Sequence, residues 1–203
     1  MYYPVMPSGT ICPLEPLMTT DTTSEILQNV CTLLSKGQIN SASSLIRERY
    51  PFAPAKKSLR QYSPRQMTSV FIKDGFIDRY RGTRLVFPPS LRLISRFLPN
   101  EFPYHKNWKM TECHSAYWEL LPTIDHIHPV ALGGADTVDN WISCSMLTNN
   151  LKSVWTSEQL GWELLPPGDR RVWDGLLTWF VECIEKDQTL LNETYFKRWH
   201  IAA

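Results

Sequence analysis

The stretch TIDHIHPVALGGADTVDNWISCSMLTNNLK, residues 123–152, decides how this chain is expected to fold. TIDHIHPV (123–130) has the β-branched composition of a strand, and ALGGADTVDN (131–140) has the glycine, aspartate and asparagine residues of a loop. A short apolar run at 141–143 and a helical pattern over about 144–154 follow. The stretch therefore predicts a strand, a loop, a second extended run and a helix.

Three polar side chains in this stretch can converge on one point. Asp125 and His126 lie together at the end of the predicted strand, and Asn149 lies on the predicted helix. Neighbouring side chains on a strand diverge, so Asp125 and His126 would approach a substrate from different sides, as in-line displacement at phosphorus requires. Imidazole is the side chain that best suits a general base near neutral pH. The oxygen atoms of Asp125 and Asn149 are hard donors, which suit Mg²⁺ or Mn²⁺ better than zinc.

These residues resemble the motif of the HNH nucleases, which belong to the ββα-metal or His-Me finger superfamily. His126 matches the first motif position, Asn140 lies 14 residues later at the middle one, and Asn149 lies 23 residues after His126 at the last. This is an H-N-N variant, similar to the HNH domain of the RNA-guided CRISPR nucleases. Asp125 falls on the metal-binding position of the family. Pro129, Gly133 and Gly134 match the loop residues of the family. Lys152 matches the basic residue that follows the motif.

The resemblance implies an α+β fold, in which a small ββα-metal core carries helical N-terminal and C-terminal extensions. It also implies a metal-dependent phosphodiesterase. In the implied mechanism, His126 deprotonates a water that attacks the phosphate, and one Mg²⁺ held by Asp125 and Asn149 neutralises charge on the leaving oxygen. Asn140 ties the loop together and orients the strand that carries His126. DNA is the expected substrate; the alternatives are an RNA-cleaving toxin and a nucleic-acid-binding module that has lost catalysis.

Three neighbouring residues allow more than one interpretation. Asn150 competes with Asn149 for the ligand position, and the motif spacing favours Asn149. His128 shares a strand face with His126, but the motif does not require it, so a surface or substrate-contact role is favoured over a catalytic one. Lys152 shares a helix face with Asn149 and is expected to contact phosphate, the alternative being a solvated lysine.

The sequence departs from the zinc-binding branch of the family. That branch has two C-x-x-C pairs, and the equivalent positions here hold Asp78 and Arg81, then Ser145 and Thr148. No structural zinc is therefore expected. The apolar C-terminal helices are expected to hold the core together instead.

A basic segment lies upstream of the motif. Residues 47–109 contain 14 Lys or Arg against 4 Asp or Glu, although the net charge of the whole chain is only +1. Such a segment can follow a phosphate backbone, or it can be a solvated face that pairs with acidic flanks. The predicted nucleic-acid contacts are Lys56, Lys57, Arg79, Arg81, Arg84 and Lys152.

Helices are expected on both sides of the motif. A capping-box pattern at Thr22 and Glu25 and a stop signal at Gly37 predict one helix, and others are expected over 40–49, over 66–73, and within 88–99 and 107–121. FIDRY and TRLVF, on either side of Arg81-Gly82, predict a β-hairpin. An apolar stripe from Val172 to Ile184 predicts packing helices. The expected domains are an N-terminal arm and helical extension (1–65), a nuclease core (66–165) and C-terminal packing helices (166–203).

Length and composition limit the protein class. The chain has 203 residues, enough for one full-sized domain with a single functional centre. It has no run of about 18 apolar residues to cross a membrane and no export-signal pattern. Its five cysteines form no C-x-x-C pair, which excludes a Cys-rich zinc site and favours a reducing cytoplasm. Cleavage of both DNA strands would be easiest for a homodimer, and the sequence leaves dimerisation open.

Overall fold

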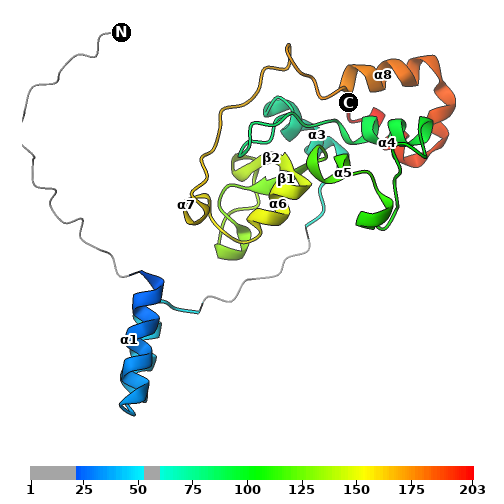
Figure 1. Ribbon diagram of the computed structural model, residues 1–203. Helices are drawn as coiled ribbons and strands as arrows, with labels where there is room; N and C mark the ends of the chain where they lie inside the picture. Colours follow the sequence, from blue (N-terminus) through cyan, green and yellow to red (C-terminus); the bar gives the residue numbers. More distant parts are fainter. Residues whose placement is uncertain (1–21, 53–59) are drawn as a thin grey trace, which may run out of the picture. The chain divides into compact units, whose positions relative to one another are not determined.

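The computed structural model describes residues 22–52 and 60–203. The chain forms two compact units, divided after Ala53 (Figure 1). The first unit is a pair of helices, and the second combines helices with a small sheet, so that the fold is α+β. Within the described ranges, no helix is long and apolar enough to cross a membrane.

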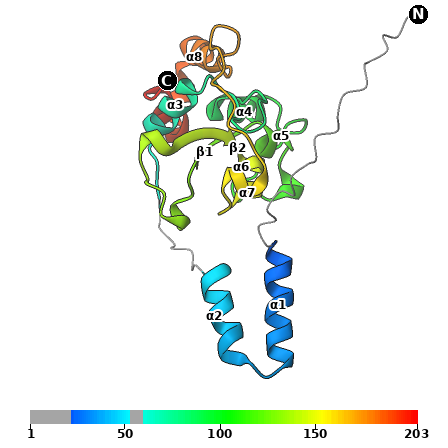
Figure 2. The ribbon, with the colours of Figure 1, turned by 90° about the vertical axis from the view of Figure 1, so that its left-hand side faces the viewer.

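The first unit is a helical hairpin formed by α1 (Thr23–Ser35) and α2 (Ile39–Arg49). Figure 2 shows the two helices side by side and antiparallel. The capping box is present, since Thr22 accepts a hydrogen bond from the backbone of Glu25 and the Glu25 carboxylate accepts one from the backbone of Thr22. Gly37 ends α1 with a φ of +72°. Both predicted helices are therefore confirmed.

The second unit is built around an antiparallel pair of strands, β1 (Pro122–His126) and β2 (Trp141–Ser145), followed by α6 (Met146–Lys152). This is the predicted order of strand, loop, strand and helix. The register places His126 opposite Trp141. Helix α6 begins two residues later than expected, because Ser145 ends β2 and caps the helix by accepting the Thr148 N–H at 3.0 Å.

Helices enclose this sheet. Helix α3 (Pro64–Lys73) and α6 each contact both strands. The remaining helices are α4 (Pro88–Phe97), α5 (Ala116–Glu119), α7 (Ser157–Leu160), α8 (Leu177–Lys186) and α9 (Thr194–His200), with short 3₁₀ turns at Met110–Glu112, Val130–Leu132, Val138–Asn140 and Gln188–Asn192. The C-terminal helices share one core with the sheet and α3. Its buried aromatic side chains are Phe71, Phe76, Phe87, Trp141, Phe180, Phe196 and Trp199.

The predicted β-hairpin around Arg81-Gly82 is present only in shortened form. The two segments form a single bridge, between Ile77 and Arg84, instead of two paired strands. The cause is the fully buried carboxylate of Asp78, whose Oδ1 accepts the backbone N–H groups of Tyr80 (3.0 Å) and Arg81 (3.1 Å). These local hydrogen bonds curl the chain into a turn and compete with an extended ladder.

Asp78, Arg81, Ser145 and Thr148 lie close together and are linked by hydrogen bonds. The other carboxylate oxygen of Asp78 accepts the Ser145 N–H at 3.0 Å, and the Ser145 hydroxyl donates to Thr148 at 2.9 Å. Together with the bond from the backbone of Arg81, hydrogen bonds connect all four residues. The Asp78 carboxylate thus joins the 78–81 turn to the start of α6.

The C-terminal stripe forms a shorter helix than predicted. Helix α8 begins only at Leu177, because Leu176 adopts a φ of +60° and the Asp174 carboxylate accepts the Leu176 N–H at 2.9 Å. Val172 and Trp173 precede the helix, and the Trp173 indole donates to the Leu85 carbonyl at 2.8 Å. The first part of the apolar stripe, which precedes Leu177, is therefore a loop instead of a helix.

A long segment without regular structure joins α7 to α8 and crosses the second unit (Figure 1). At the crossing, Gly168 donates its N–H to the Asp74 carbonyl at 3.0 Å. A Cβ atom added to Gly75 would lie 2.1 Å from the Gly168 carbonyl oxygen. Only residues without a side chain allow the two backbones to approach this closely.

Replacing Asp78 tests whether its carboxylate holds β2 in place. We expect Asp78→Ala to lower the free energy of unfolding by about 3 kcal/mol, because the buried N–H groups of Tyr80 and Ser145 lose their acceptor. Denaturant unfolding followed by circular dichroism measures this. Asp139→Ala is the matched control, since Asp139 is exposed and its side chain has no hydrogen bond within the described ranges. Equal unfolding free energies for the two variants would contradict the assignment.

Candidate functional site

A pocket of about 170 Å³ lies at the end of β1. It is lined by Asp125 and His126 from β1, by Pro129 from the following loop and by Asn149 from α6. The sequence pattern selected all four residues, and the fold brings them together. Arg60 and Tyr62, which precede α3, complete the polar lining.

Asp125 and Lys152 form a buried ion pair beside this pocket. Lys152 Nζ lies 2.9 Å from Asp125 Oδ2, and the lysine side chain is fully buried. The ammonium also donates to the His126 carbonyl at 2.8 Å. This placement differs from the predicted phosphate contact of Lys152, because an ammonium without exposed surface cannot reach a nucleic acid. Lys152 instead fixes the end of α6 against the end of β1.

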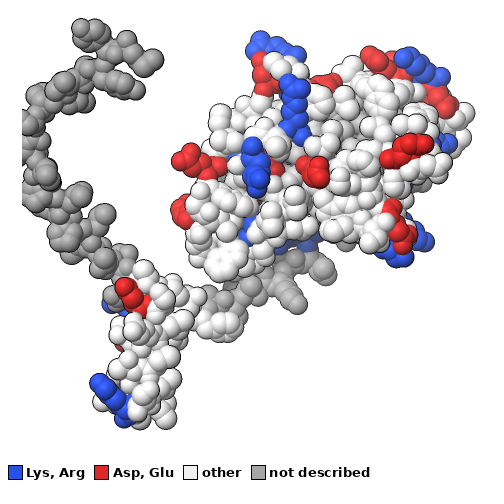
Figure 3. All heavy atoms as spheres, viewed as in Figure 1, with Lys and Arg blue, Asp and Glu red and all other residues white. Residues whose placement is uncertain are grey.

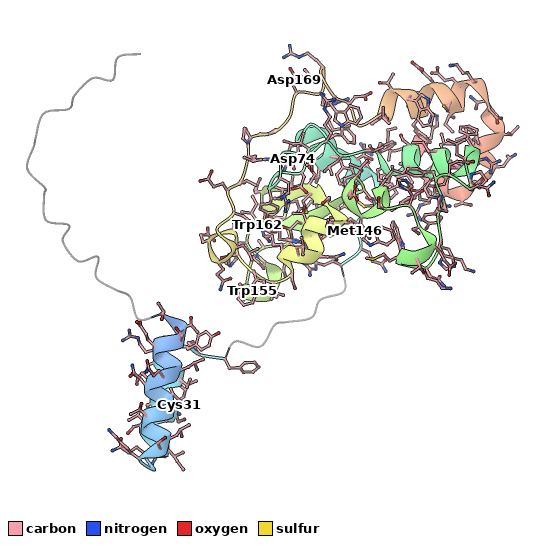
Figure 4. The ribbon with its side chains drawn as sticks, viewed as in Figure 1. Cys31, Asp74, Met146, Trp155, Trp162 and Asp169 are labelled. Atoms are coloured by element: carbon pink, nitrogen blue, oxygen red, sulfur yellow. The ribbon has the colours of Figure 1, made fainter. Side chains whose placement is uncertain are left out.

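Tyr80 holds the same carboxylate from the other side. Its hydroxyl donates to Asp125 Oδ2 at 2.8 Å, and its ring packs on Trp162, which Figure 4 labels, at a centroid distance of 5.5 Å. Burial, together with the neighbouring Asp125 carboxylate, raises the pKa of Tyr80 well above its ordinary value. The phenol is therefore a permanent hydrogen-bond donor to Asp125.

Asn149 faces β1, whereas Asn150 is exposed. The side-chain Nδ2 of Asn149 donates to Thr123 Oγ1 at 2.9 Å and to the Ile124 carbonyl at 3.2 Å. These bonds fix which way the amide lies. The geometry therefore supports the choice of Asn149 over Asn150.

The donor set fits one hard divalent cation. Asp125 and Asn149 each keep their Oδ1 atom free of hydrogen bonds to the part of the chain that the structure describes. One carboxylate and one amide oxygen, completed by water, form the kind of site that suits Mg²⁺. The same part of the chain has no cluster of three or more His, Cys, Asp or Glu side chains that could hold a metal ion.

His126 is held by partners on both ring nitrogens. Nε2 lies 2.8 Å from Asp136 Oδ1, and Nδ1 lies 3.3 Å from Arg60. Because a guanidinium can only donate, Nδ1 is the acceptor and Nε2 carries the proton toward Asp136. The neutral imidazole therefore presents the Nδ1 lone pair on the Arg60 side, and Arg60 lines the pocket.

Asp136 is the centre of a polar cluster beside His126. Besides the imidazole, its Oδ1 accepts hydrogen bonds from the Tyr62 hydroxyl and the Trp141 indole, both at 2.8 Å. Burial opposes ionisation of this carboxyl group, but the hydrogen bonds from His126, Tyr62 and Trp141 outweigh burial and hold its pKa below the ordinary value. Burial and the same carboxylate raise the pKa of Tyr62 to about 12. Asp136 is thus an anion that orients the imidazole.

Asn140 closes the loop that follows His126. Its Oδ1 accepts the His128 N–H at 2.8 Å, and its Nδ2 donates to the carbonyls of His128 (2.9 Å) and Ala135 (2.8 Å). Gly133 takes a φ of +96°, and a Cβ on Gly134 would lie 2.0 Å from the His128 carbonyl oxygen. The closed loop leaves the His128 side chain exposed, where its imidazole has one long contact, 3.4 Å, to the Leu132 carbonyl.

The predicted nucleic-acid contacts fall into different environments. Arg79 is largely buried: its guanidinium pairs with Asp74 at 2.6 Å and donates to the Leu165 carbonyl at 2.6 Å, so it is not available to phosphate. Arg81 and Arg84 are exposed. On the face drawn in Figure 3, basic and acidic side chains are interspersed and form no continuous basic patch. Lys56 and Lys57 lie outside the described residues.

Sequence reasoning did not select four residues that surround Asp125 and His126: Arg60, Tyr62, Tyr80 and Asp136. Arg60 belonged only to a general basic segment. Asp136 could not be distinguished from Asp139 in the same loop by composition. Their contacts depend on how the loop and the chain before α3 fold back on β1.

Removing the lysine charge tests the buried ion pair. We expect Lys152→Met to lower the free energy of unfolding by about 3 kcal/mol or more, because Asp125 would be left buried without a counter-charge. The exposed Lys106→Met is the control, and thermal and denaturant unfolding are the measurements. If Lys152→Met is as stable as the control and its DNA affinity depends less on salt, the predicted phosphate contact of Lys152 would be supported instead.

No protein-family model matches the chain, and neither a curated protein nor a solved structure matches it. The chemistry of this pocket is therefore argued from its own residues.

Proposed function

We propose that this chain is a metal-dependent nucleic-acid phosphodiesterase, a DNA endonuclease of the HNH type, with β1, β2 and α6 as its ββα-metal core. The observation that carries the proposal is one pocket that combines an oriented neutral imidazole, His126, with two free hard oxygen donors, Asp125 and Asn149. A base and a cation site on one phosphate-sized pocket are what phosphodiester hydrolysis requires.

In this proposal, His126 Nδ1 accepts the proton of the attacking water. Asp136 keeps the opposite Nε2–H in place and stabilises the imidazolium that forms, in the way that a carboxylate supports a catalytic histidine. Arg60 lies at the pocket with only donor groups and would pair with a non-bridging phosphate oxygen, which would release Nδ1. Asp125 and Asn149 would hold Mg²⁺ or Mn²⁺, which supplies charge stabilisation at the phosphate.

Lys152 and Tyr80 position the proposed metal ligand. Both bind Oδ2 of Asp125, which leaves Oδ1 as the atom for a cation. The nearby ammonium also weakens attraction for a cation, so binding would rest on water ligands and substrate phosphate as well. Cytoplasmic location is part of the proposal, in keeping with the unpaired cysteines at 31, 113, 144 and 183.

The test is cleavage of plasmid DNA, with structured RNA in parallel, in Mg²⁺, in Mn²⁺ and in EDTA. We expect nicked or linear plasmid with either metal and none in EDTA. His126→Ala should lower the rate by about 10² to 10⁴ with DNA binding intact, because the general base is lost. His128→Ala is the matched control, since His128 is exposed and lies outside the pocket.

The possible outcomes separate the alternatives. Cleavage of RNA alone would favour the toxin-type nuclease. Binding without cleavage in every metal would favour the module without catalysis. An active His126→Ala beside an inactive His128→Ala would show that the base is assigned to the wrong histidine.

The two asparagines of α6 provide a second test. Asn149→Ala should raise the Mg²⁺ concentration needed for half-maximal cleavage by about tenfold or more, because one of two protein ligands is lost. Asn150→Ala should leave that concentration unchanged, since its side chain is exposed. A metal titration of each variant measures this, and equal shifts would mean that the helix register is wrong.

Asp136→Asn tests whether this carboxylate positions His126. We expect kcat to fall about tenfold to a hundredfold at an unchanged KM, with Asp139→Asn as control. The effect on stability has a defined sign. Because the folded-state pKa of Asp136 is lowered, its contribution is fully present above the ordinary aspartate pKa of about 4 and is lost as the pH falls through the lowered value. Equal kcat values for the two variants would remove Asp136 from the mechanism.

A further inference from the structure

A second cavity lies next to the candidate active site. It has a volume of about 350 Å³ and shares Tyr62 and Ile124 with the pocket at His126. We call it the aromatic cavity, because six of the thirteen residues that line it are aromatic. The aromatic residues that line it are Tyr62, Tyr104, Trp108, Tyr117, Tyr195 and Trp199.

Segments distant in the sequence build this wall. Tyr62 precedes α3, Tyr104 and Trp108 follow α4, and Tyr195 and Trp199 lie on α9. The deepest member, Tyr117, is fully buried and hydrogen-bonded to Ser95 (2.7 Å) and the Leu91 carbonyl (3.0 Å). These hydrogen bonds fix the Tyr117 ring, against which Tyr104 and Trp108 pack.

Arg92 is the cationic group of the aromatic cavity. Its guanidinium lies over the Tyr104 ring at 3.5 Å and over the Tyr195 ring at 5.0 Å. Within the described ranges it has neither an ion-pair nor a hydrogen-bond partner, and no Asp or Glu lines the cavity. One turn later on α4, Arg96 pairs with Glu193. The half-buried guanidinium of Arg92 therefore keeps its N–H donors for a ligand.

Strand β1 connects the aromatic cavity to the candidate active site. Thr123 and Ile124 line the cavity, and Ile124, Asp125 and His126 line the pocket. At about 3.3 Å per strand residue, the two sites lie within roughly the reach of one nucleotide. Tyr62 belongs to both sites. It lines the aromatic cavity, and its hydroxyl donates a hydrogen bond to Asp136 beside the pocket at 2.8 Å.

We propose that the aromatic cavity binds one unstacked nucleobase of the strand whose phosphate lies at His126. This inference rests on the proposed function and specifies its substrate as a locally unpaired strand. The base would stack on the tyrosine and tryptophan rings, and its acceptor edge would take the N–H donors of Arg92. A duplex is too wide for a cavity of this size, and an aliphatic ligand would leave the guanidinium unsatisfied.

The experiment measures binding to the unaltered chain, without any need for cleavage. The probes are the four deoxynucleoside 5′-monophosphates, adenosine 5′-monophosphate, and deoxyribose 5-phosphate, which has no base. Calorimetry gives the affinities, and tryptophan fluorescence reports on Trp108 and Trp199, which line the cavity. We expect nucleotides to bind about tenfold or more tightly than the sugar phosphate, as stacking of one base implies. Comparison of the two adenine nucleotides shows whether the 2′-hydroxyl contributes.

Two variants locate the binding. Arg92→Met and Tyr104→Leu should each reduce the preference for nucleotide over sugar phosphate by about fivefold or more, with the melting temperature recorded to show that the chain is folded. Arg96→Met, on the same helix and outside the aromatic cavity, should keep the full preference. Should one cavity variant fail to fold, the other, together with the base-dependence of the unaltered chain, still decides the question.

The outcomes separate this inference from the proposed function. Equal affinities for nucleotides and sugar phosphate, or a base preference that survives both cavity variants, would overturn the base site even if the plasmid is cut. A base preference lost in the cavity variants would support it even if no nucleic acid is cleaved. In that second case only the proposed nuclease activity would fail.

Discussion

The buried ion pair between Lys152 and Asp125 is the contact on which the candidate site depends. Two charges taken out of water are tolerated only with good geometry and further hydrogen bonds, and both conditions are met here by the His126 carbonyl and the Tyr80 hydroxyl. The pair fixes the last turn of α6 against the end of β1. Asn149, one turn earlier, and His126 take their positions from that junction. A single buried lysine therefore sets the geometry of the residues proposed to hold the metal and to act as the base.

A two-stranded sheet needs support along its outer edge, and buried carboxylates supply it. The Ser143 and Ser145 N–H groups of β2 donate to Asp74 and Asp78 at 2.6 and 3.0 Å. Side chains thus accept the hydrogen bonds that a third strand would otherwise take. Asp78 thereby joins the 78–81 turn to the end of β2.

The sequence predicted the elements whose signals are local. The capping residues of α1 marked its ends, and the order of β1, loop, β2 and α6 followed from composition. Asp125, His126 and Asn149 were selected by their residue types and by the resemblance of their spacing to the HNH motif. The hairpin at Arg81 is shorter than its β-rich composition indicates, because propensity does not show that a buried Asp78 will accept the hydrogen bonds of the turn. The burial of Lys152 and Arg79 was missed for a related reason: a charged residue becomes internal only when a distant segment supplies its partner.

The close approach of Gly75 and Gly168 affects the order in which the parts of this protein can fold. The chain must return more than ninety residues later to the turn after α3, and Trp199 then packs on Phe87 at a centroid distance of 5.4 Å. Contacts of such long sequence separation form late and slowly. While the polypeptide is being synthesised, β1, β2 and α6 emerge before the C-terminal helices, which share a core with the two strands. Every residue that lines the pocket at His126 precedes α7, so a partly synthesised chain would carry all the site residues before the C-terminal helices complete the core beside β1 and β2.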